Sequence, residues 1–401
     1  MSRPPTYTPL PTSELDADEE SSLFADEDQL EDHYTTNTTN KSRTLRASSR
    51  SKKHLAFVLL SLAVVMTALV RGAQHLVRGF RMRGCHTGLG GSRNQSTKFA
   101  NGGGLTTHFT LPSGDKIPSV ALGVWRAEKN LVGTAVKAAL NVGYRHIDGA
   151  WIYGNEHEVG NALKANGIAR DKVWLTSKLW NTFHAPEDVE PTLDESLARL
   201  GVEYLDLYLI HWPVAFYKDG KKYDRELTAN PYPTWQKLEE MVEKGKVRNI
   251  GVSNFNIPRL KNLTANPLKV KPAVNQVELN FWNPQPELLK WSKENGILLE
   301  AYSPLGSAEQ VKKTLAVPEI KEIAAAQGMT PAQVIISWHV QRGSVVLPKS
   351  VHCDRVKENF QVAALPQDAF DKLEKAATSH APQRVVNPSK SWGLDFDVFD
   401  D

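Results

Sequence analysis

The alternation of apolar and polar positions changes character near Leu105. Beyond this residue, short apolar runs alternate with longer segments in which apolar residues recur with the helical period of about 3.6 residues. Two alternating runs on either side of Pro-Ser-Gly-Asp open this region and predict a β-hairpin. The apolar runs that then predict strands are VALGVW, YRHIDGA, VWLTSKLW, YLDLYLIHW, VRNIGVSN, AVNQVELN, ILLEAYSPL and SVVLPKS.

Amphipathic segments lie between these runs and predict helices. Two examples are PEDVEPTLDESLARLG and TPAQVIISWHVQRG, and the second has a Thr N-cap, Pro at its first helical position and Gly343 at its end. Eight strand–helix units over roughly 300 residues fit a (β/α)8 barrel. A doubly wound sheet is the alternative, but no G-x-G-x-x-G loop follows the first strand. We therefore expect an α/β fold, a TIM barrel over residues 105–401 that begins with the hairpin.

The first 104 residues have a different pattern. Residues 1–53 are acidic, then polar and basic, with too little apolar surface to offset chain entropy, so we expect a disordered tail. Residues 54–71 enclose an uncharged apolar run, Leu55 to Val70, between basic flanks. This run predicts a single transmembrane signal-anchor helix rather than a buried soluble helix, because it has no amphipathic period. Residues 72–104, with GLGGS and NGGG, are expected to form a flexible linker.

The predicted span implies a single-pass membrane protein, which we expect in the endomembrane system. More basic residues precede the predicted span than follow it, so the positive-inside rule favours a barrel in the lumen. The difference in the number of basic residues is small, so the sequence leaves the side open. In a lumenal barrel, Asn94 and Asn262 would be glycosylation acceptors.

Charge and cysteine content exclude several classes of function. The formal net charge of +3 gives no electrostatic case for nucleic-acid binding. Cys85 and Cys353 are too few for a disulfide framework or a zinc site, and no H-E-x-x-H spacing occurs, so no metal is expected. A self-contained barrel buries its core without a second subunit, so we expect a monomer.

Polar side chains gather at the carboxyl ends of the predicted strands, the face on which TIM barrels build active sites. They are Asp148, Lys178, His211, Ser253, Asn254, Gln276, Glu278, Tyr302, Ser303 and Lys349. Any one of them alone is read as a hydrogen-bonded polar group at a strand end. Together, on consecutive strands, they indicate a site.

Asp148 and Lys178 end neighbouring predicted strands and are expected to form a buried ion pair. Such a pair is costly as a stabilising device, so its place at the barrel mouth favours a functional role. The ammonium is expected to lower the pKa of nearby Tyr153 from about 10, so that Tyr153 can donate a proton to a carbonyl oxygen. His211 would orient that carbonyl, although a core histidine is its alternative reading.

An anion site is predicted around the last strand. Cations and backbone donors meet where this strand ends and a helix starts, at Lys349, Ser350, Arg355 and Asn359. The SPLGS segment after the seventh strand offers Gly306 and serine hydroxyls to a pyrophosphate, and Tyr302 is placed to stack on a planar ring. A solvated charged helix is the alternative reading of DRVKEN.

The chain resembles the aldo-keto reductases in an ordered series of stretches between residue 105 and about residue 390: GYRHIDGAWIYGNEHEVG, LTSKLW, LYLIHWP, IGVSNF, NQVELN, EAYSPLGS and VLPKSVHCDRVKEN. The resemblance is closest to fungal NADP-dependent glycerol dehydrogenases, aldehyde reductases and xylose reductases. It implies NADPH-dependent reduction of aldehydes and aldoses to alcohols, and the reverse NADP-linked oxidation, by hydride transfer.

The resemblance also implies a role for each site residue. The catalytic tetrad would be Asp148, Tyr153, Lys178 and His211, with Tyr153 as the general acid. The nicotinamide of NADP(H) would be held by Ser253, Asn254, Gln276 and Tyr302. Its pyrophosphate would contact Ser303, Leu305 and Ser307, and its 2′-phosphate Lys349, Ser350, Arg355 and Asn359. An apolar substrate cleft would be walled by Trp125, Trp180, Trp212 and His211.

Two features depart from the family. Asn280 stands where many relatives carry His, and the C-terminal NPSKSWGLDFDVFDD lies where relatives differ most, so substrate and preferred direction stay open. The alternative function on the same barrel is a membrane-attached regulatory subunit that binds NADPH without turnover. The intact tetrad favours the enzyme.

Overall fold

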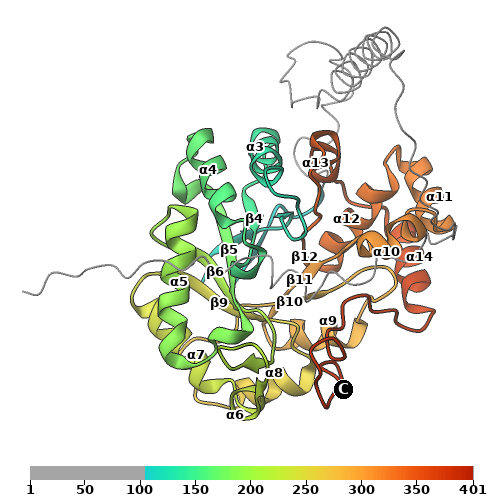
Figure 1. The fold of residues 1–401 in the computed structure, drawn as a ribbon. Helices are drawn as coiled ribbons and strands as arrows, with labels where there is room; N and C mark the ends of the chain where they lie inside the picture. Colours follow the sequence, from blue (N-terminus) through green and yellow to red (C-terminus); the bar gives the residue numbers. More distant parts are fainter. Residues whose placement is uncertain (1–103, 401) are drawn as a thin grey trace, which may run out of the picture. The chain divides into compact units, whose positions relative to one another are not determined.

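The computed structural model describes residues 104–400 (Figure 1). The predictions for the tail at 1–53 and the membrane helix at 54–71, and for the linker at 72–104 except its last residue, lie outside the described residues. Across 104–400, no helix combines the length and the apolar character needed to cross a membrane.

The described part begins with the predicted hairpin. Strand β1 (His108–Thr110) pairs antiparallel with β2 (Lys116–Pro118). The connection turns at Gly114, whose φ of 92° lies in the left-handed region that favours glycine. Ile117 is fully buried in a cluster with Leu207 and Val345 from two strands of the main sheet. The hairpin therefore packs against the main sheet.

Eight parallel strands form the main sheet: β3 (Leu122–Gly123), β4 (His146–Asp148), β5 (Trp174–Leu179), β6 (Leu205–Ile210), β9 (Val247–Ser253), β10 (Val274–Glu278), β11 (Leu298–Tyr302) and β12 (Val345–Val346). Their order in the sheet follows the chain. The first and last strands also meet, because Val120 bridges Val346 and the Ala121 N–H donates to the Val346 carbonyl at 2.9 Å. The sheet closes as the strand–helix pattern predicted.

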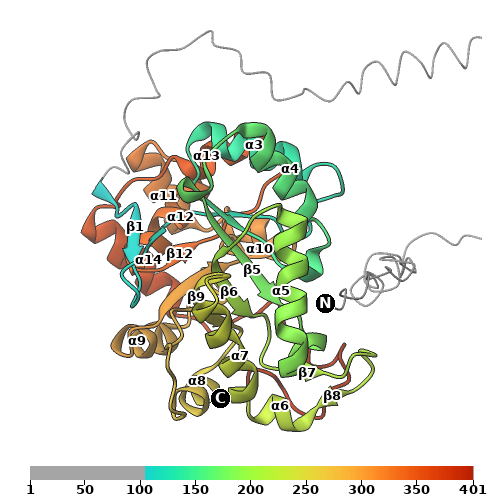
Figure 2. The same cartoon turned by 90° about the vertical axis from the view of Figure 1, so that its left-hand side faces the viewer.

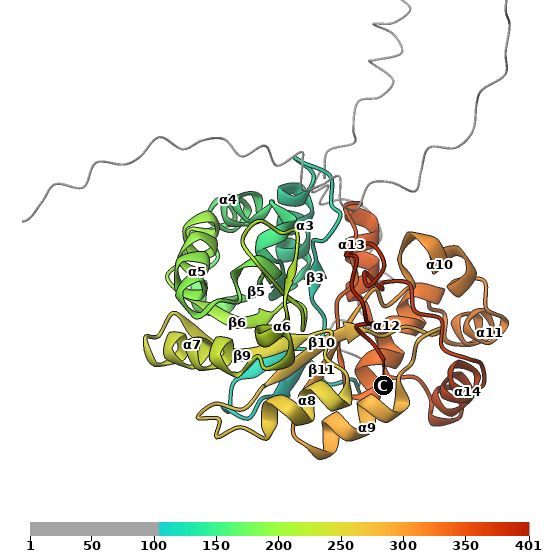
Figure 3. The same ribbon diagram turned by 60° about the horizontal axis from the view of Figure 1, so that its bottom comes forward.

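Helices surround this wall (Figure 3). The main helices after successive strands are α3 (Val132–Val142), α4 (Glu156–Asn166), α5 (Pro186–Leu200), α7 (Tyr232–Glu243), α8 (Ile257–Thr264), α9 (Pro286–Glu294), α12 (Pro331–Arg342) and α13 (Cys353–Phe360). Inserted or terminal elements are β7 (Ala215–Phe216), β8 (Tyr223–Asp224), α6 (Arg225–Ala229), α10 (Ser307–Thr314), α11 (Pro318–Gln327) and α14 (Gln367–Thr378). Helices α3, α4 and α5 lie side by side (Figure 2).

Helix α12 illustrates how local sequence sets these boundaries. The Thr330 hydroxyl accepts from the Gln333 N–H, and the Gln333 side chain accepts from the Thr330 N–H, which makes a capping box. The helix ends at Gly343, whose φ of 91° lets its N–H reach the last carbonyls. Both ends agree with the sequence prediction.

The apolar core lies between the strands and the helices. Ile147 and Leu175 from the strands pack in one cluster with Val136 and Val189 from α3 and α5. Because side chains alternate along a strand, the neighbours of Ile147, His146 and Asp148, face the inside of the barrel. The helices thus pack against the outer face of the closed sheet, and its inner face can carry polar groups.

Candidate active site

Asp148 and Lys178 form the predicted ion pair. They lie on the neighbouring parallel strands β4 and β5, and Lys178 Nζ donates to Asp148 Oδ1 at 2.8 Å and Oδ2 at 3.0 Å, and to the Gly149 carbonyl at 2.7 Å. Lys178 is fully buried and Asp148 is 4% exposed. Burial by itself lowers the pKa of Lys178, but the charges of Asp148 and Tyr153 outweigh it and leave the pKa above 10.5. The ammonium therefore keeps its charge.

Tyr153 belongs to the short 3-10 helix η3 (Trp151–Tyr153) that follows β4. Its hydroxyl lies 3.5 Å from Lys178 Nζ, so the predicted proximity is confirmed. The predicted lowering of its pKa is wrong. Burial raises the pKa of Tyr153 above 10, and the Lys178 ammonium offsets only part of that effect. The phenol is thus protonated at neutral pH and can donate its proton.

His211 follows β6 and faces this phenol. The ring centroids of His211 and Tyr153 are 5.8 Å apart, and Trp180 packs on another side of the imidazole at 5.3 Å. Burial, followed by the charges of Lys178 and His184, holds the pKa of His211 well below 6.5. A neutral imidazole carries one N–H, which can hydrogen-bond a carbonyl oxygen bound beside Tyr153. His211 is therefore suited to orient a substrate, as predicted from the sequence.

The four residues expected to hold a nicotinamide form one hydrogen-bonded group. The Ser253 hydroxyl donates to the Gln276 carbonyl at 2.8 Å, and the Tyr302 hydroxyl donates to Asn254 Oδ1 at 2.8 Å. Asn254 Nδ2 donates to the His211 carbonyl at 3.0 Å. Asn254 has a left-handed φ of 65°, a strained backbone of the kind that clusters at functional sites. The group is thereby joined directly to the backbone of the candidate tetrad.

The loop between β11 and α10 contains the predicted pyrophosphate residues. Ser303 and Ser307 both have left-handed φ values, 47° and 56°, and the Ser307 hydroxyl donates to Ser303 Oγ at 2.7 Å. A Cβ at Gly306 would lie 2.7 Å from the Cβ of Gln310, so only glycine fits there. Leu305 packs on the apolar cluster around Phe281. The loop is tightly folded and leaves serine hydroxyls beside Tyr302.

The predicted phosphate-binding residues meet at the start of α13. The backbone of Lys349 bridges Gly123 of the first barrel strand, and Ser350 Oγ accepts from the His352 N–H at 3.1 Å. Lys349 and Arg355 are exposed, and neither forms an ion pair with a carboxylate of residues 104–400. Asn359 is 5% exposed on the same helix. Two cations that form no ion pair within the described residues, beside a helix N-terminus, fit a bound phosphate.

Aromatic side chains gather beside His211. Trp180 and Trp212 both contact Trp392, whose ring centroid lies 6.1 Å and 5.1 Å from theirs. Trp392 comes from the C-terminal segment and also packs on Phe216 at 5.5 Å. Trp125 makes none of these ring contacts among the residues described and instead stacks under Arg126. Sequence reasoning marked the C-terminal segment for substrate choice but did not single out Trp392.

Glu278 and Asn280 anchor that C-terminal segment. Glu278 accepts from the Val385 N–H at 2.9 Å and the Val386 N–H at 2.8 Å, and Asn280 Nδ2 donates to Glu278 at 3.1 Å. Asn280 Oδ1 also accepts from the backbone of Trp282, which closes a tight turn. The sequence analysis counted Glu278 among the polar side chains at the strand ends that indicate a site. In the structure it holds the segment that carries Trp392.

The structure also brings Glu300 into the site, which sequence reasoning missed. Glu300 is fully buried on β11, and its carboxylate accepts from Gln276 Nε2 at 2.8 Å. Burial, together with the charge of Asp148, raises the pKa of Glu300 to about 8. The available signal was an acid inside the otherwise apolar run ILLEAYSPL.

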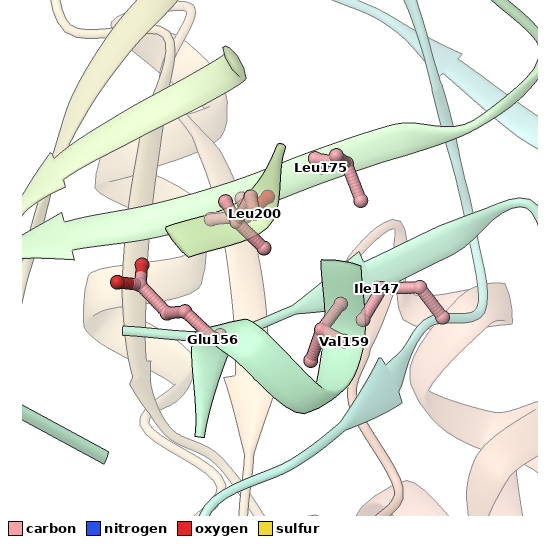
Figure 4. A pocket seen from close by; sticks show the side chains of 7 residues that line it. Ile147, Glu156, Val159, Leu175 and Leu200 are labelled. Carbon is pink, nitrogen blue, oxygen red and sulfur yellow. The ribbon is translucent and has the colours of Figure 1, made fainter. Parts of the chain in front are cut away.

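A small cavity lies behind β4 and β5, between these strands and the helices α4 and α5 (Figure 4). It is lined by residues of β4, β5, α4 and α5, among them Ile147, Leu175 and Leu200. It lies on the helix side of the strands, whereas Asp148 and Lys178 face the barrel interior, so it is not the substrate site. Within residues 104–400, no group of three or more His, Cys, Asp or Glu side chains is arranged to hold a metal ion.

Known proteins share this arrangement of sequence and fold. Residues 119–378 match the aldo/keto reductase family model. The chain is 42% identical over 310 residues to glycerol 2-dehydrogenase (NADP(+)) of Saccharomyces cerevisiae, which covers 73% of this chain and 97% of that protein. It is 42% identical over 300 residues to D/L-glyceraldehyde reductase of Hypocrea jecorina, with 70% and 89% covered. Among solved structures, the aldose reductase of Schistosoma japonicum is similar, with a TM-score of 0.66, 35% identity and 72% and 97% coverage. The chain belongs to the aldo/keto reductase family.

Proposed function

We propose that this protein catalyses the NADPH-dependent reduction of aldehydes and aldoses to alcohols, and the reverse NADP-linked oxidation. The observation that carries the proposal is the contact between the Lys178 ammonium and the Tyr153 hydroxyl beside the neutral His211. The substrate class is supported by relatives named glycerol 2-dehydrogenase, D/L-glyceraldehyde reductase and aldehyde reductase.

The residues of the chain perform the acid–base part of the reaction. NADPH, when bound, supplies the hydride that reduces the carbonyl carbon. Tyr153 gives its proton to the carbonyl oxygen, and the Lys178 ammonium stabilises the phenolate that remains. Asp148 holds the ammonium in place, and the N–H of His211 keeps the oxygen near Tyr153. In the reverse direction, the phenolate takes the alcohol proton back.

NADPH would be held by the predicted cofactor residues. Ser253, Asn254 and Gln276 would hold the carboxamide, and Tyr302 would stack on the ring. The hydroxyls of Ser303 and Ser307, with the backbone at Leu305, would contact the pyrophosphate. The adenosine 2′-phosphate would lie against Lys349, Ser350, Arg355 and Asn359. Cations at that position favour NADPH over NADH, because a free ribose offers them no charge.

Trp180, Trp212 and Trp392 would form the substrate cleft in front of His211. Their apolar faces suit aldehydes with an aromatic or short aliphatic body, and the reacting carbonyl would point toward Tyr153. Trp125 is proposed as a further wall on the side of β3. The barrel is proposed to act as a monomer on these small molecules.

The decisive experiment measures NADPH oxidation by the purified full chain in detergent, with DL-glyceraldehyde and with a nitrobenzaldehyde. The matched control is Tyr153→Phe, which removes only the hydroxyl. Turnover in the wild type and its loss in the variant, with NADPH binding retained in both, would establish the reductase. Tight NADPH binding without turnover of either aldehyde would support the regulatory subunit instead. No structural observation favours that second function.

Membrane attachment through residues 54–71 is proposed on the sequence alone, with the protein in the endomembrane system. The test is alkaline carbonate extraction of membranes from cells that produce the full chain or a variant lacking residues 55–70. The full chain should remain with the membranes, and the variant should be released. Release of both would end the proposal. Glycan removal with an endoglycosidase, compared with Asn262→Gln, would then report the side on which the barrel lies.

A further inference from the structure

Gln276 and Glu300 face each other across two parallel strands inside the barrel. They are paired in register on β10 and β11, and they are 2% and 0% exposed. Gln276 Nε2 donates to Glu300 Oε2 at 2.8 Å and also to Asp148 Oδ2 at 2.8 Å. Both N–H bonds of the Gln276 amide are therefore used by acid side chains.

This double contact determines which way the amide points. A carboxylate oxygen only accepts hydrogen bonds, so the nitrogen of Gln276, and not its oxygen, must face Asp148. With Glu300 holding the second N–H, the amide has a single favourable orientation. Its Oε1 takes no hydrogen bond from any residue that the structure describes. Without Glu300, one N–H would be free and the amide plane could turn.

If packing were its only role, Glu300 would destabilise the folded state at this position. Its Oε1 is buried without a hydrogen-bond partner among the described residues and lies 4.0 Å from His146 Nε2. His146 is itself occupied, since its Nε2 lies 3.1 Å from Thr176 Oγ1. A buried polar atom without a partner destabilises the folded state, and a methionine or leucine would not have this effect. The acid is therefore better explained by the contact that its other oxygen makes.

The contact does not depend on the charge of Glu300. The ionisable groups that face it are Asp148, Lys178 and His146. Burial lowers the pKa of His146 to about 4, so that imidazole is neutral, and the pKa of Glu300 is raised to about 8. With its proton on Oε1, Glu300 still accepts from Gln276 through Oε2. A neutral amide at position 300 can offer the same acceptor.

This inference rests on the proposed reductase function. We propose that Glu300 is a positioning residue for the cofactor: by holding the second N–H of Gln276, it presents Gln276 Oε1 to the carboxamide N–H of the nicotinamide. The nicotinamide ring is then oriented by an acceptor whose direction is set inside the barrel. Glu300 itself touches neither cofactor nor substrate.

The test compares Glu300→Gln, which keeps an acceptor, with Glu300→Met, which removes it at similar volume. The dissociation constant of NADPH is measured by fluorescence titration of the full chain, and kcat and KM are measured with DL-glyceraldehyde. The loss of one hydrogen bond predicts a dissociation constant about five- to tenfold higher for Glu300→Met. Its kcat should fall while the KM for the aldehyde stays unchanged. Glu300→Gln should restore NADPH binding to within about twofold of the wild type.

A double-mutant cycle with Gln276→Met tests whether Glu300 affects NADPH binding through Gln276. Glu300→Met should have no further effect on NADPH binding once Gln276 has been replaced. The proposal is overturned if Glu300→Met binds NADPH like the wild type, if Glu300→Gln loses as much as Glu300→Met, or if the losses add in the double variant. Thermal unfolding of each variant identifies any that fail to fold. If Glu300→Met alone fails to fold, the comparison of Gln276→Met with the double variant Gln276→Met/Glu300→Met decides. A wild type that neither binds NADPH nor turns over would instead contradict the proposed function.

Discussion

The ammonium of Lys178 lies 3.5 Å from the hydroxyl of Tyr153, and the lysine is fully buried. The two groups respond to burial in opposite senses. Tyr153 holds its proton more firmly because the phenolate is disfavoured there, and Lys178 remains charged because Asp148 faces it. The transferable proton therefore belongs to Tyr153, and Lys178 acts by stabilising the phenolate after the proton has left.

Lys178→Met should reduce both activity and stability. It removes the charge that stabilises the phenolate, so we expect kcat for aldehyde reduction to fall by about 100-fold or more. It also leaves Asp148 buried without its partner, which costs roughly 3–5 kcal/mol of unfolding free energy. Steady-state kinetics and chemical denaturation measure the two effects. The double variant Asp148→Asn/Lys178→Met should recover much of the stability and none of the activity, and recovery of activity would contradict the role of Lys178.

The two directions of the reaction should depend on pH in opposite ways. Reduction consumes the proton of Tyr153, so its kcat should be flat through neutral pH and fall only as pH rises toward the raised pKa of Tyr153. Alcohol oxidation needs the phenolate and should rise over the same range. His211 is neutral throughout, because its pKa lies well below 6.5. Profiles of kcat in both directions test this, and a fall in reduction near pH 6.5 would point to His211 instead.

Glu300→Gln should stabilise the protein, and more so at high pH. The pKa of Glu300 is raised from 4.5 to about 8, so the folded state binds a proton that the unfolded state has released between these values. The unfolding free energy of the wild type therefore falls as pH rises from about 4.5 to about 8. The unfolding free energy of the variant does not fall in this way, because its amide does not titrate. Melting temperatures at about pH 5 and about pH 9 give the comparison. The exposed Glu294→Gln on α9 is the control and should show no such difference.

Glu278→Gln should change substrate preference without changing cofactor affinity. Oε1 of Glu278 accepts from the Val385 N–H and from Asn280 Nδ2, and Oε2 accepts from Val385 and Val386, so the NH2 group of a glutamine would face a donor in either orientation. The C-terminal segment should loosen, and Trp392 should lose its contacts with Trp212. We expect the KM for a nitrobenzaldehyde to rise about fivefold, with little change for glyceraldehyde. Trp392→Ala should reproduce the selectivity change, and an equal rise for both substrates would contradict the argument.

Arg355→Ala should weaken the preference for NADPH over NADH. A charge-assisted contact to a phosphate contributes about 1.5–3 kcal/mol, so the ratio of kcat/KM values should fall by about 10- to 100-fold. The KM for NADH should change little, since a free ribose carries no charge for the guanidinium. Lys357→Ala, another exposed cation on α13, is the matched control. An equal loss with both cofactors would assign Arg355 a structural role.

Much of the barrel could be read from the sequence because its signals are local. Alternation and helical period mark strands and helices within short windows, and the cap at Thr330 and the stop at Gly343 use residues within the same helix. The Asp148–Lys178 pair was also predictable, because consecutive parallel strands bring their carboxyl ends together. These inferences need only the neighbours of each residue in the chain or in the strand order.

The tertiary structure alone decided three other features. The pKa of Tyr153 depends on how completely the folded chain excludes water from the phenol. The sequence indicates the nearby cation, Lys178, but not how deeply Tyr153 is buried. The contact of Gln276 with Glu300 depends on the register of two strands, because a shift of one residue would turn one side chain to the outer face. Trp392 meets Trp212 only after the C-terminal segment returns to the barrel mouth and Glu278 holds its backbone. The exclusion of water from a side chain, the register of two strands and the return of the C-terminal segment to the barrel mouth depend on the whole fold. No local pattern in the chain encodes them.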